Sequence, residues 1–124
     1  MPQKIIIADD EDMVREAVRL CLQDGGYEIY EAADGREALE LARRILPDLM
    51  VLDVMMPGMA GYRVCTELKK DEATKNIFIL FLTARGTQQA ENTVIRSGGD
   101  EFMAKPFDPA LLREKVKQAL ETEA

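Results

Sequence analysis

Short apolar runs alternate along the chain with longer segments in which apolar residues recur every three or four positions. The runs are rich in β-branched and aliphatic residues, which predicts buried strands. They are Lys4–Ala8, Tyr27–Ala32, Leu49–Leu52, Ile77–Leu82 and Phe102–Ala104. Their nearly continuous apolar character is typical of strands that are covered on both faces.

The intervening segments predict amphipathic helices with recognisable ends. Their apolar stripes run from Val14 to Leu22, Ala38 to Ile45, Val64 to Leu68, and Leu112 to Leu120, with a weaker helix over Gln88–Ser97. Gly25-Gly26 and Gly98-Gly99 are expected to stop the helices that precede them. Asp34 and Asp108 open helices as N-caps, and Pro47 follows the end of the second.

Strand and helix alternate five times, which predicts right-handed βαβ crossovers and a parallel sheet with helices on both faces. The chain has 124 residues, the usual size of one compact domain. We therefore expect a single α/β domain over residues 1–124.

Composition removes several classes of function. The formal net charge of −7 argues against a direct nucleic-acid binder and against docking on anionic lipid. No signal peptide or membrane-length apolar stretch is present, so a cytoplasmic protein is expected. Cys21 and Cys65 lie in helical apolar patterns and are expected to be reduced core residues. The sequence contains no histidine, which excludes imidazole bases and ligands from this chain.

Ligands of open parallel sheets bind outside the carboxyl ends of the strands. Asp9 and Asp10 follow the first strand, Asp53 ends the third, Thr83 ends the fourth and Lys105 follows the fifth. Each has an ordinary explanation alone, as a helix cap, a turn residue, a strand residue or a solvated lysine. Their coincidence at one sheet edge is what those explanations leave unaccounted for.

Carboxylates crowded together repel one another unless a cation neutralises them. Mg²⁺ prefers hard oxygen ligands and typically uses one or two carboxylates with a substrate phosphate. A carboxylate in such a site can attack a phosphoryl group and form an aspartyl phosphate. Mg²⁺ and Lys105 would neutralise the phosphoryl oxygens, and Thr83 would donate a hydroxyl.

The sequence resembles the receiver domain of two-component response regulators over essentially its whole length. The matching stretches are Ile5-Ile6-Ile7-Ala8-Asp9-Asp10-Glu11, Ala33-Asp34-Gly35, Pro47-Asp48-Leu49, Asp53 through Gly61, Leu82-Thr83-Ala84 and Lys105-Pro106-Phe107. Each stretch alone is weak, whereas all of them in this order are highly specific. The resemblance implies a flavodoxin-like (βα)₅ fold with strand order 2-1-3-4-5.

The resemblance also implies roles for individual residues. It makes Asp53 the phospho-acceptor, and it places Mg²⁺ on Asp10, on Asp9 through water, on Asp53 and on the backbone carbonyl of Met55. Thr83 matches the family's switch hydroxyl and Phe102 its switch aromatic. Lys105 matches the lysine that pairs with the phosphoryl group, and the resemblance implies a cis peptide bond between Lys105 and Pro106. Met55 and Arg85 match variable positions that tune dephosphorylation. These residues are all read from the sequence.

The same resemblance implies partners. A sensor histidine kinase or a histidine phosphotransferase would supply the phosphoryl group. A downstream effector, or a second copy of the chain, would bind the surface formed by the fourth helix, fifth strand and fifth helix. The sequence names neither the kinase nor the output. It leaves open whether the chain is a stand-alone regulator or part of a longer one.

The segment Gly98-Gly99-Asp100-Glu101-Phe102 spells the signature of diguanylate cyclases. A cyclase domain is larger than this chain, and the pentapeptide runs directly into Met103-Ala104-Lys105-Pro106-Phe107, which matches receivers. We therefore interpret it as a helix-ending glycine pair followed by acidic residues.

Two other functions remain to be weighed. A haloacid-dehalogenase-like phosphatase also uses Asp, Thr and Lys around Mg²⁺, but it carries its nucleophile after the first strand as Asp-x-Asp, whereas Asp9 and Asp10 are adjacent here. A flavin-binding module would need a phosphate-cradling loop after that strand, where Asp9–Asp12 would repel a flavin phosphate.

Overall fold

The computed structural model describes residues 2–84, 92 and 96–121 of the chain. Its centre is an all-parallel sheet in the order β2-β1-β3-β4-β5, which confirms the predicted fold class. The strands are β1 Lys4–Ala8, β2 Glu28–Ala32, β3 Leu49–Asp53, β4 Phe78–Thr83 and β5 Glu101–Ala104. This is the strand order of the flavodoxin-like fold.

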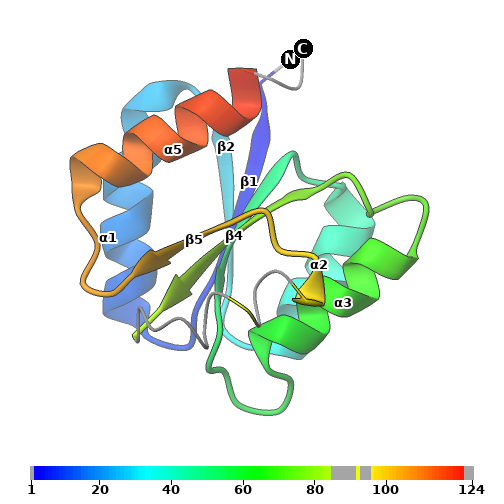
Figure 1. Cartoon of the computed structure of the whole chain (residues 1–124). Helices are drawn as coiled ribbons and strands as arrows, with labels where there is room; N and C mark the ends of the chain where they lie inside the picture. The colour runs from blue at the N-terminus through cyan, green and yellow to red at the C-terminus, as the bar shows by residue number, and fades with distance from the viewer. Residues whose placement is uncertain (1, 85–91, 93–95, 122–124) are drawn as a thin grey trace.

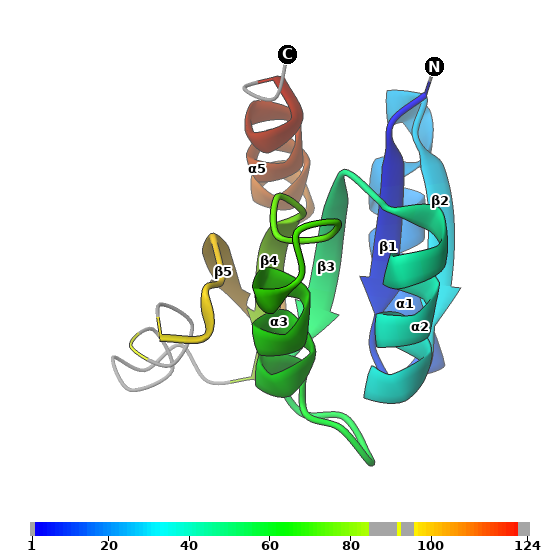
Figure 2. The same cartoon turned by 90° about the vertical axis from the view of Figure 1, so that its right-hand side faces the viewer.

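Helices cover both faces of the sheet, with α1 and α5 on one face and α2 and α3 on the other (Figure 1; Figure 2). Their bounds are α1 Asp12–Leu22, α2 Gly35–Ile45, α3 Gly61–Lys70 and α5 Pro109–Glu121, with a 3₁₀ turn over Gln23–Gly25. The helix predicted over Gln88–Ser97 falls mostly outside the described residues. Asn92, Arg96 and Ser97 are the described parts of it, and they are helical.

Each face of the sheet carries its own core. Alternating strand residues such as Ile6, Met50 and Phe81 pack with α2 and α3. Their neighbours, such as Ile7 and Leu80, pack with α1 and α5. All of these side chains are fully or almost fully buried. Burial on both faces explains why the strands are continuously apolar in sequence.

Most helix ends follow the predicted signals. The Asp34 carboxylate accepts a hydrogen bond from the Glu37 N–H at 2.8 Å, and the Asp108 carboxylate accepts one from Ala110 at 2.9 Å. Gly26, at φ 77°, ends the 3₁₀ turn in the left-handed region. The exception is Leu46, which ends α2 at φ 51°, a conformation that the sequence does not signal because a side chain disfavours it.

The strands all enter at one edge of the sheet and leave at the opposite edge, because every pairing is parallel. Different residues lie at the two edges. At the entry edge the Gln3 side chain donates to the Leu120 carbonyl at 3.2 Å, so the start of β1 contacts the end of α5. None of the helices within the described ranges is long and apolar enough to span a membrane.

Candidate functional site

The exit edge of the sheet gathers the predicted carboxylates. Asp9 follows β1 and Asp53 ends β3, the strand beside it. Asp9 and Asp53 are 1% and 4% exposed, whereas Asp10 is exposed. Each of the three offers a carboxylate oxygen, and these oxygens lie within 4.8 Å of one another. The three predicted carboxylates therefore lie close together in the structure.

Lys105 reaches this cluster from the loop after β5. Its Nζ lies 2.7 Å from Asp9 Oδ2, 3.4 Å from Asp53 Oδ1 and 3.9 Å from Glu11 Oε1. The bond between Lys105 and Pro106 is cis, as predicted. The Lys105 N–H donates to the Thr83 carbonyl at 2.7 Å, which fixes the start of the loop against β4. The ammonium thus occupies the position from which it can neutralise an anion beside Asp53.

Asp9 leaves acceptor capacity in this site. Its Oδ1 accepts the Glu11 N–H at 2.9 Å. Its buried Oδ2 forms an ion pair with the Lys105 ammonium at 2.7 Å. Asp9 and Asp53 share this ammonium, and the three carboxylates are held so close together that they repel one another. The residues present therefore fit a hard divalent cation such as Mg²⁺, which takes carboxylate oxygens as ligands.

Burial and charge shift the titration of these groups. Burial first, and the neighbouring Asp9 carboxylate second, raise the pKa of Asp53 from its ordinary 3.8 to about 6, against the opposing effects of Lys105 and the Met55 N–H. Burial by itself would lower the pKa of Lys105, but its contacts with Asp9 and Asp53 outweigh this and raise it. Lys105 is therefore a fixed cation at neutral pH. Ionisation of Asp53, in contrast, lowers the stability of the folded protein.

That cost predicts a pH-dependent stability difference. Without metal, the free energy of unfolding should fall as pH rises from about 4 to about 6, because folded Asp53 holds its proton to a higher pH than the unfolded chain does. Asp53→Asn removes this loss. After allowance for solvent screening, we expect the variant to be more stable by roughly 1–2 kcal/mol at pH 7.5. Urea denaturation in EDTA at several pH values measures it.

Two comparisons make the result specific. At pH 3.5 the two proteins should differ little, since both carry an uncharged side chain there. At pH 7.5, added Mg²⁺ should stabilise the wild type more than the variant, because the cation offsets the same repulsion. A stability difference that stays constant across the pH range would contradict burial of the Asp53 charge as its cause.

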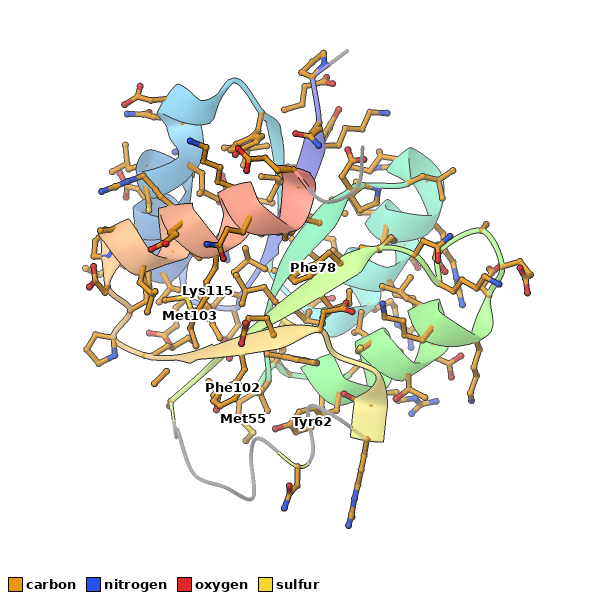
Figure 3. All side chains as sticks on the ribbon, turned by 45° about the horizontal axis from the view of Figure 1, so that its top comes forward. Met55, Tyr62, Phe78, Phe102, Met103 and Lys115 are labelled. Carbon is orange, nitrogen blue, oxygen red and sulfur yellow. The ribbon has the colours of Figure 1, made fainter. Side chains whose placement is uncertain are left out.

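Thr83 and Phe102 lie on one face of adjacent strands. Thr83 ends β4 and is 6% exposed. Phe102 pairs with Phe81 in register, and Thr83 pairs with Ala104, so Thr83 and Phe102 are diagonal neighbours roughly 8 Å apart between Cα atoms. The half-buried Phe102 ring packs with the core that includes Tyr62, away from Met103 and Lys115 (Figure 3).

The loop after β3 contains the remaining predicted site positions. Met55 is 74% exposed, and its N–H donates to Asp53 Oδ1 at 3.3 Å. Its carbonyl stays a predicted metal contact. Arg85, predicted to tune dephosphorylation together with Met55, lies outside the described residues.

Two glycines let the helices approach this loop. A Cβ on Gly61 would lie 2.1 Å from the carbonyl oxygen of Asp53, and one on Gly35 would lie 2.0 Å from that of Met59. The first turn of α3 therefore packs directly on the backbone of the Asp53 residue. Sequence reasoning used these glycines only as loop and helix-start signals, because a close approach between distant segments has no local pattern.

The acidic pentapeptide has structural partners throughout. Gly98 has φ 91°. The Asp100 carboxylate accepts the Ile79 N–H at 2.8 Å and pairs with Lys69 Nζ at 3.2 Å, and Glu101 pairs with Lys115 at 3.2 Å. These contacts join the turn before β5 to α3 and β4, which supports the structural interpretation of this segment.

Sequence reasoning missed one arginine beside the site and predicted one cysteine incompletely. Arg15 donates from Nη1 to the Asp9 carbonyl at 2.6 Å and from Nε to Glu31 at 3.1 Å. In sequence Arg15 looks like an ordinary polar helix position, since Asp9 and Glu31 lie outside its helix. Both cysteines are free, but only Cys65 is fully buried, whereas Cys21 is half-buried between α1 and α5.

Comparisons with known proteins agree with this fold. The family model for the response regulator receiver domain matches residues 5–117. A crystal structure of a protein described as a response regulator from Chloroflexus aurantiacus superposes with a TM-score of 0.92 at 39% identity, covering 98% of this chain and 99% of that one. The chemotaxis protein CheY4 of Vibrio cholerae gives 0.90 at 32% identity, with 96% and 99% covered.

Curated relatives are longer than this chain. The DNA-binding dual master transcriptional regulator RpaA of Synechocystis is 37% identical over 117 residues, which are 94% of this chain and 48% of that protein. The chain thus spans about half the length of the curated relatives it matches.

Proposed function

The chain belongs to the family of response regulator receiver domains of two-component signalling, and we propose that it accepts a phosphoryl group on Asp53. The observation that carries this proposal is the convergence of carboxylate oxygens from Asp9, Asp10 and Asp53 within 4.8 Å, with the Lys105 ammonium beside them. A separated set of the same residues would not favour the reaction.

The reaction is an exchange of one bond for another. A carboxylate oxygen of Asp53 attacks the phosphorus atom of a phosphohistidine, an O–P bond forms, and the P–N bond breaks. The bonding electrons leave with the imidazole nitrogen, which takes up a proton. Phosphoryl transfer depends on positioning and on neutralising the phosphoryl oxygens, and Lys105 supplies one fixed cation for them.

A divalent cation completes the charge balance. Receiver domains generally bind Mg²⁺ at an acidic pocket, and here Asp9, Asp10 and Asp53 would hold it together with the Met55 carbonyl. When bound, Mg²⁺ neutralises the carboxylates and the incoming phosphoryl oxygens. Asp9 Oδ1 accepts the Glu11 N–H and Oδ2 pairs with Lys105 at 2.7 Å, so Asp9 would bind the cation through a water molecule.

A phosphohistidine donor must lie outside this sequence, because the sequence contains no histidine. Response regulators work with histidine kinases and with effector domains, and we propose a sensor histidine kinase or a histidine phosphotransferase as the donor. The output would be an attached or separate effector, or a second copy of the chain, bound at the surface of residues 88–97, β5 and α5. No direct contact of this domain with nucleic acid or membrane is proposed, in keeping with its charge of −7.

Acetyl phosphate with Mg²⁺ tests the proposal without a cognate kinase. Intact-mass measurement should show one phosphoryl group per chain, and its loss in EDTA. A phosphatase of the haloacid-dehalogenase type would instead turn over a small phosphomonoester continuously without accumulating the modified chain. Steady turnover of such a phosphomonoester, with no accumulation of the phosphorylated chain, would overturn the assignment of Asp53 as a receiver phospho-acceptor.

The proposed switch couples Thr83 to Phe102. A phosphoryl group on Asp53 offers the Thr83 hydroxyl a charged acceptor, and the hydroxyl moves toward it. Space opens on the face that Thr83 shares with Phe102, and the ring turns inward. The two states should differ by only a few kcal/mol, so phosphorylation shifts an existing balance.

We expect beryllofluoride, an acyl-phosphate mimic, to shift amide NMR signals of residues 83–97 and 102–105. Thr83→Ala should leave uptake from acetyl phosphate within about threefold while reducing these distant shifts by half or more, because the mobile hydroxyl is gone. Thr83→Ser keeps the hydroxyl and should retain most of the response. An Ala variant that responds as fully as wild type would mean that another route carries the signal.

A further inference from the structure

Arg15 lies beside the carboxylate cluster without belonging to it. Its Nη1 donates to the Asp9 carbonyl at 2.6 Å, its Nε donates to Glu31 Oε1 at 3.1 Å, and its Nη2 pairs with Asp12. The Arg15 side chain is only 13% exposed, against 89% for that of Asp12. One guanidinium on α1 thus connects the end of β1 to the edge strand β2.

We propose that Arg15 is a positioning residue for the metal ligands, held in place by Glu31. This inference rests on the proposed function, because it assumes that Asp9 and Asp10 hold Mg²⁺. Arg15 is not assigned a contact with the cation or with the phosphoryl group. Its role is to hold the peptide group between the two ligands.

The atom that Arg15 binds explains this role. The carbonyl oxygen of Asp9 belongs to the planar peptide unit that joins Asp9 to Asp10. Asp9 is also fixed by its N–H, which donates to the Ala32 carbonyl at 3.1 Å, and by its Oδ1, which accepts from Glu11. Asp10 is exposed, so the direction of its carboxylate depends on the backbone that precedes it.

The guanidinium is suited to this task. Its rigid fork donates to the Asp9 carbonyl and to Glu31 at the same time, which a single ammonium cannot reproduce in the same geometry. Glu31 itself is shared, since its Oε2 lies 3.5 Å from Arg19 Nε. Arg19 does not contact the Asp9 carbonyl in the described structure, and its side chain is 51% exposed. It is therefore a comparison arginine on the same helix, which shares Glu31 but lacks the contact with the Asp9 carbonyl.

Charge and positioning predict opposite signs. Removing a positive charge near three carboxylates strengthens the binding of a cation. Losing the support of metal ligands weakens it, typically by 10- to 100-fold. Arg15→Lys keeps the charge and loses the fork, so it isolates the positioning effect.

The test is the Mg²⁺ dissociation constant of the intact chain, measured by NMR titration of backbone amides with folding checked in EDTA. We expect Arg15→Lys to weaken Mg²⁺ binding about tenfold, Glu31→Gln to weaken it less, and Arg19→Lys to leave it within twofold. Should Arg15→Lys prove unstable, Arg15→Gln makes the separation, because loss of its positive charge alone would strengthen Mg²⁺ binding whereas loss of positioning weakens it.

Failure of this inference is distinguishable from failure of the proposed function. If Asp10→Asn weakens Mg²⁺ binding but Arg15→Lys and Glu31→Gln do not, the metal site stands and the positioning role is wrong. If Asp10→Asn leaves Mg²⁺ binding unchanged, the proposed metal site is wrong and the inference falls with it. If Arg19→Lys weakens binding as much as Arg15→Lys, the contact with the Asp9 carbonyl is not the cause.

Discussion

Asp53→Asn is expected to abolish uptake of a phosphoryl group from acetyl phosphate and Mg²⁺, with at least a 100-fold loss of rate. The amide keeps the shape of the side chain but is a far weaker nucleophile than a carboxylate. Lys105 retains its ion pair with Asp9 at 2.7 Å, so the loop after β5 should stay in place. Intact-mass measurement over time distinguishes no uptake from slow uptake.

The matched control is Asp24→Asn, which removes the same charge at an exposed position in the 3₁₀ turn. It should take up the phosphoryl group at the wild-type rate. The same pair can be challenged with phosphorylated histidine kinases, where only the Asp24 variant should accept the label. Undiminished uptake by Asp53→Asn would move the acceptor to Asp9 or Asp10.

The second large effect is expected at Gly61. A Cβ there would lie 2.1 Å from the carbonyl oxygen of Asp53 and 3.0 Å from its carbonyl carbon. Both are backbone atoms, so the strand end or the helix must move. We expect Gly61→Ala to lower the free energy of unfolding by about 3 kcal/mol. Phosphoryl uptake should also slow in the folded protein, because the displaced residue is the acceptor itself.

Gly58→Ala separates this close approach from the usual cost of replacing glycine. Gly58 has φ 80°, and a Cβ there would meet nothing within 4 Å. Its replacement should cost only about 1 kcal/mol, through the left-handed backbone conformation. Urea denaturation of both variants gives the comparison. Equal costs at the two positions would show that α3 can move away from Asp53 easily.

The strands and their order could be predicted because burial on both faces leaves continuous apolar runs, and because parallel connections allow few topologies. The carboxylates could be predicted as a cluster for the same reason, since Asp9 and Asp53 end neighbouring strands. The local pattern predicts where each strand ends. Because parallel strands end at the same edge of the sheet, this was enough to predict that the residues lie together.

Features that depend on contacts between distant segments could not be predicted in this way. Arg15 has its decisive partners at Asp9 and Glu31. Asp9 follows β1 and Glu31 lies on β2, so both are outside the helix that carries Arg15. Gly61 matters through a carbonyl on β3. Leu46 adopts φ 51° although leucine has no preference for it. The helix over residues 88–97 was predicted, but it lies mostly outside the described residues.

The hydrogen bond between the Gln3 side chain and the Leu120 carbonyl holds the two ends of the domain side by side, so that the backbone forms an almost closed ring. The ring closes at the edge where strands enter, roughly 16 Å, one strand length, from the carboxylates. A module tethered to either end is therefore attached at the edge opposite Asp53. A linker joining the two ends, with the chain reopened elsewhere, would leave the reactive edge untouched.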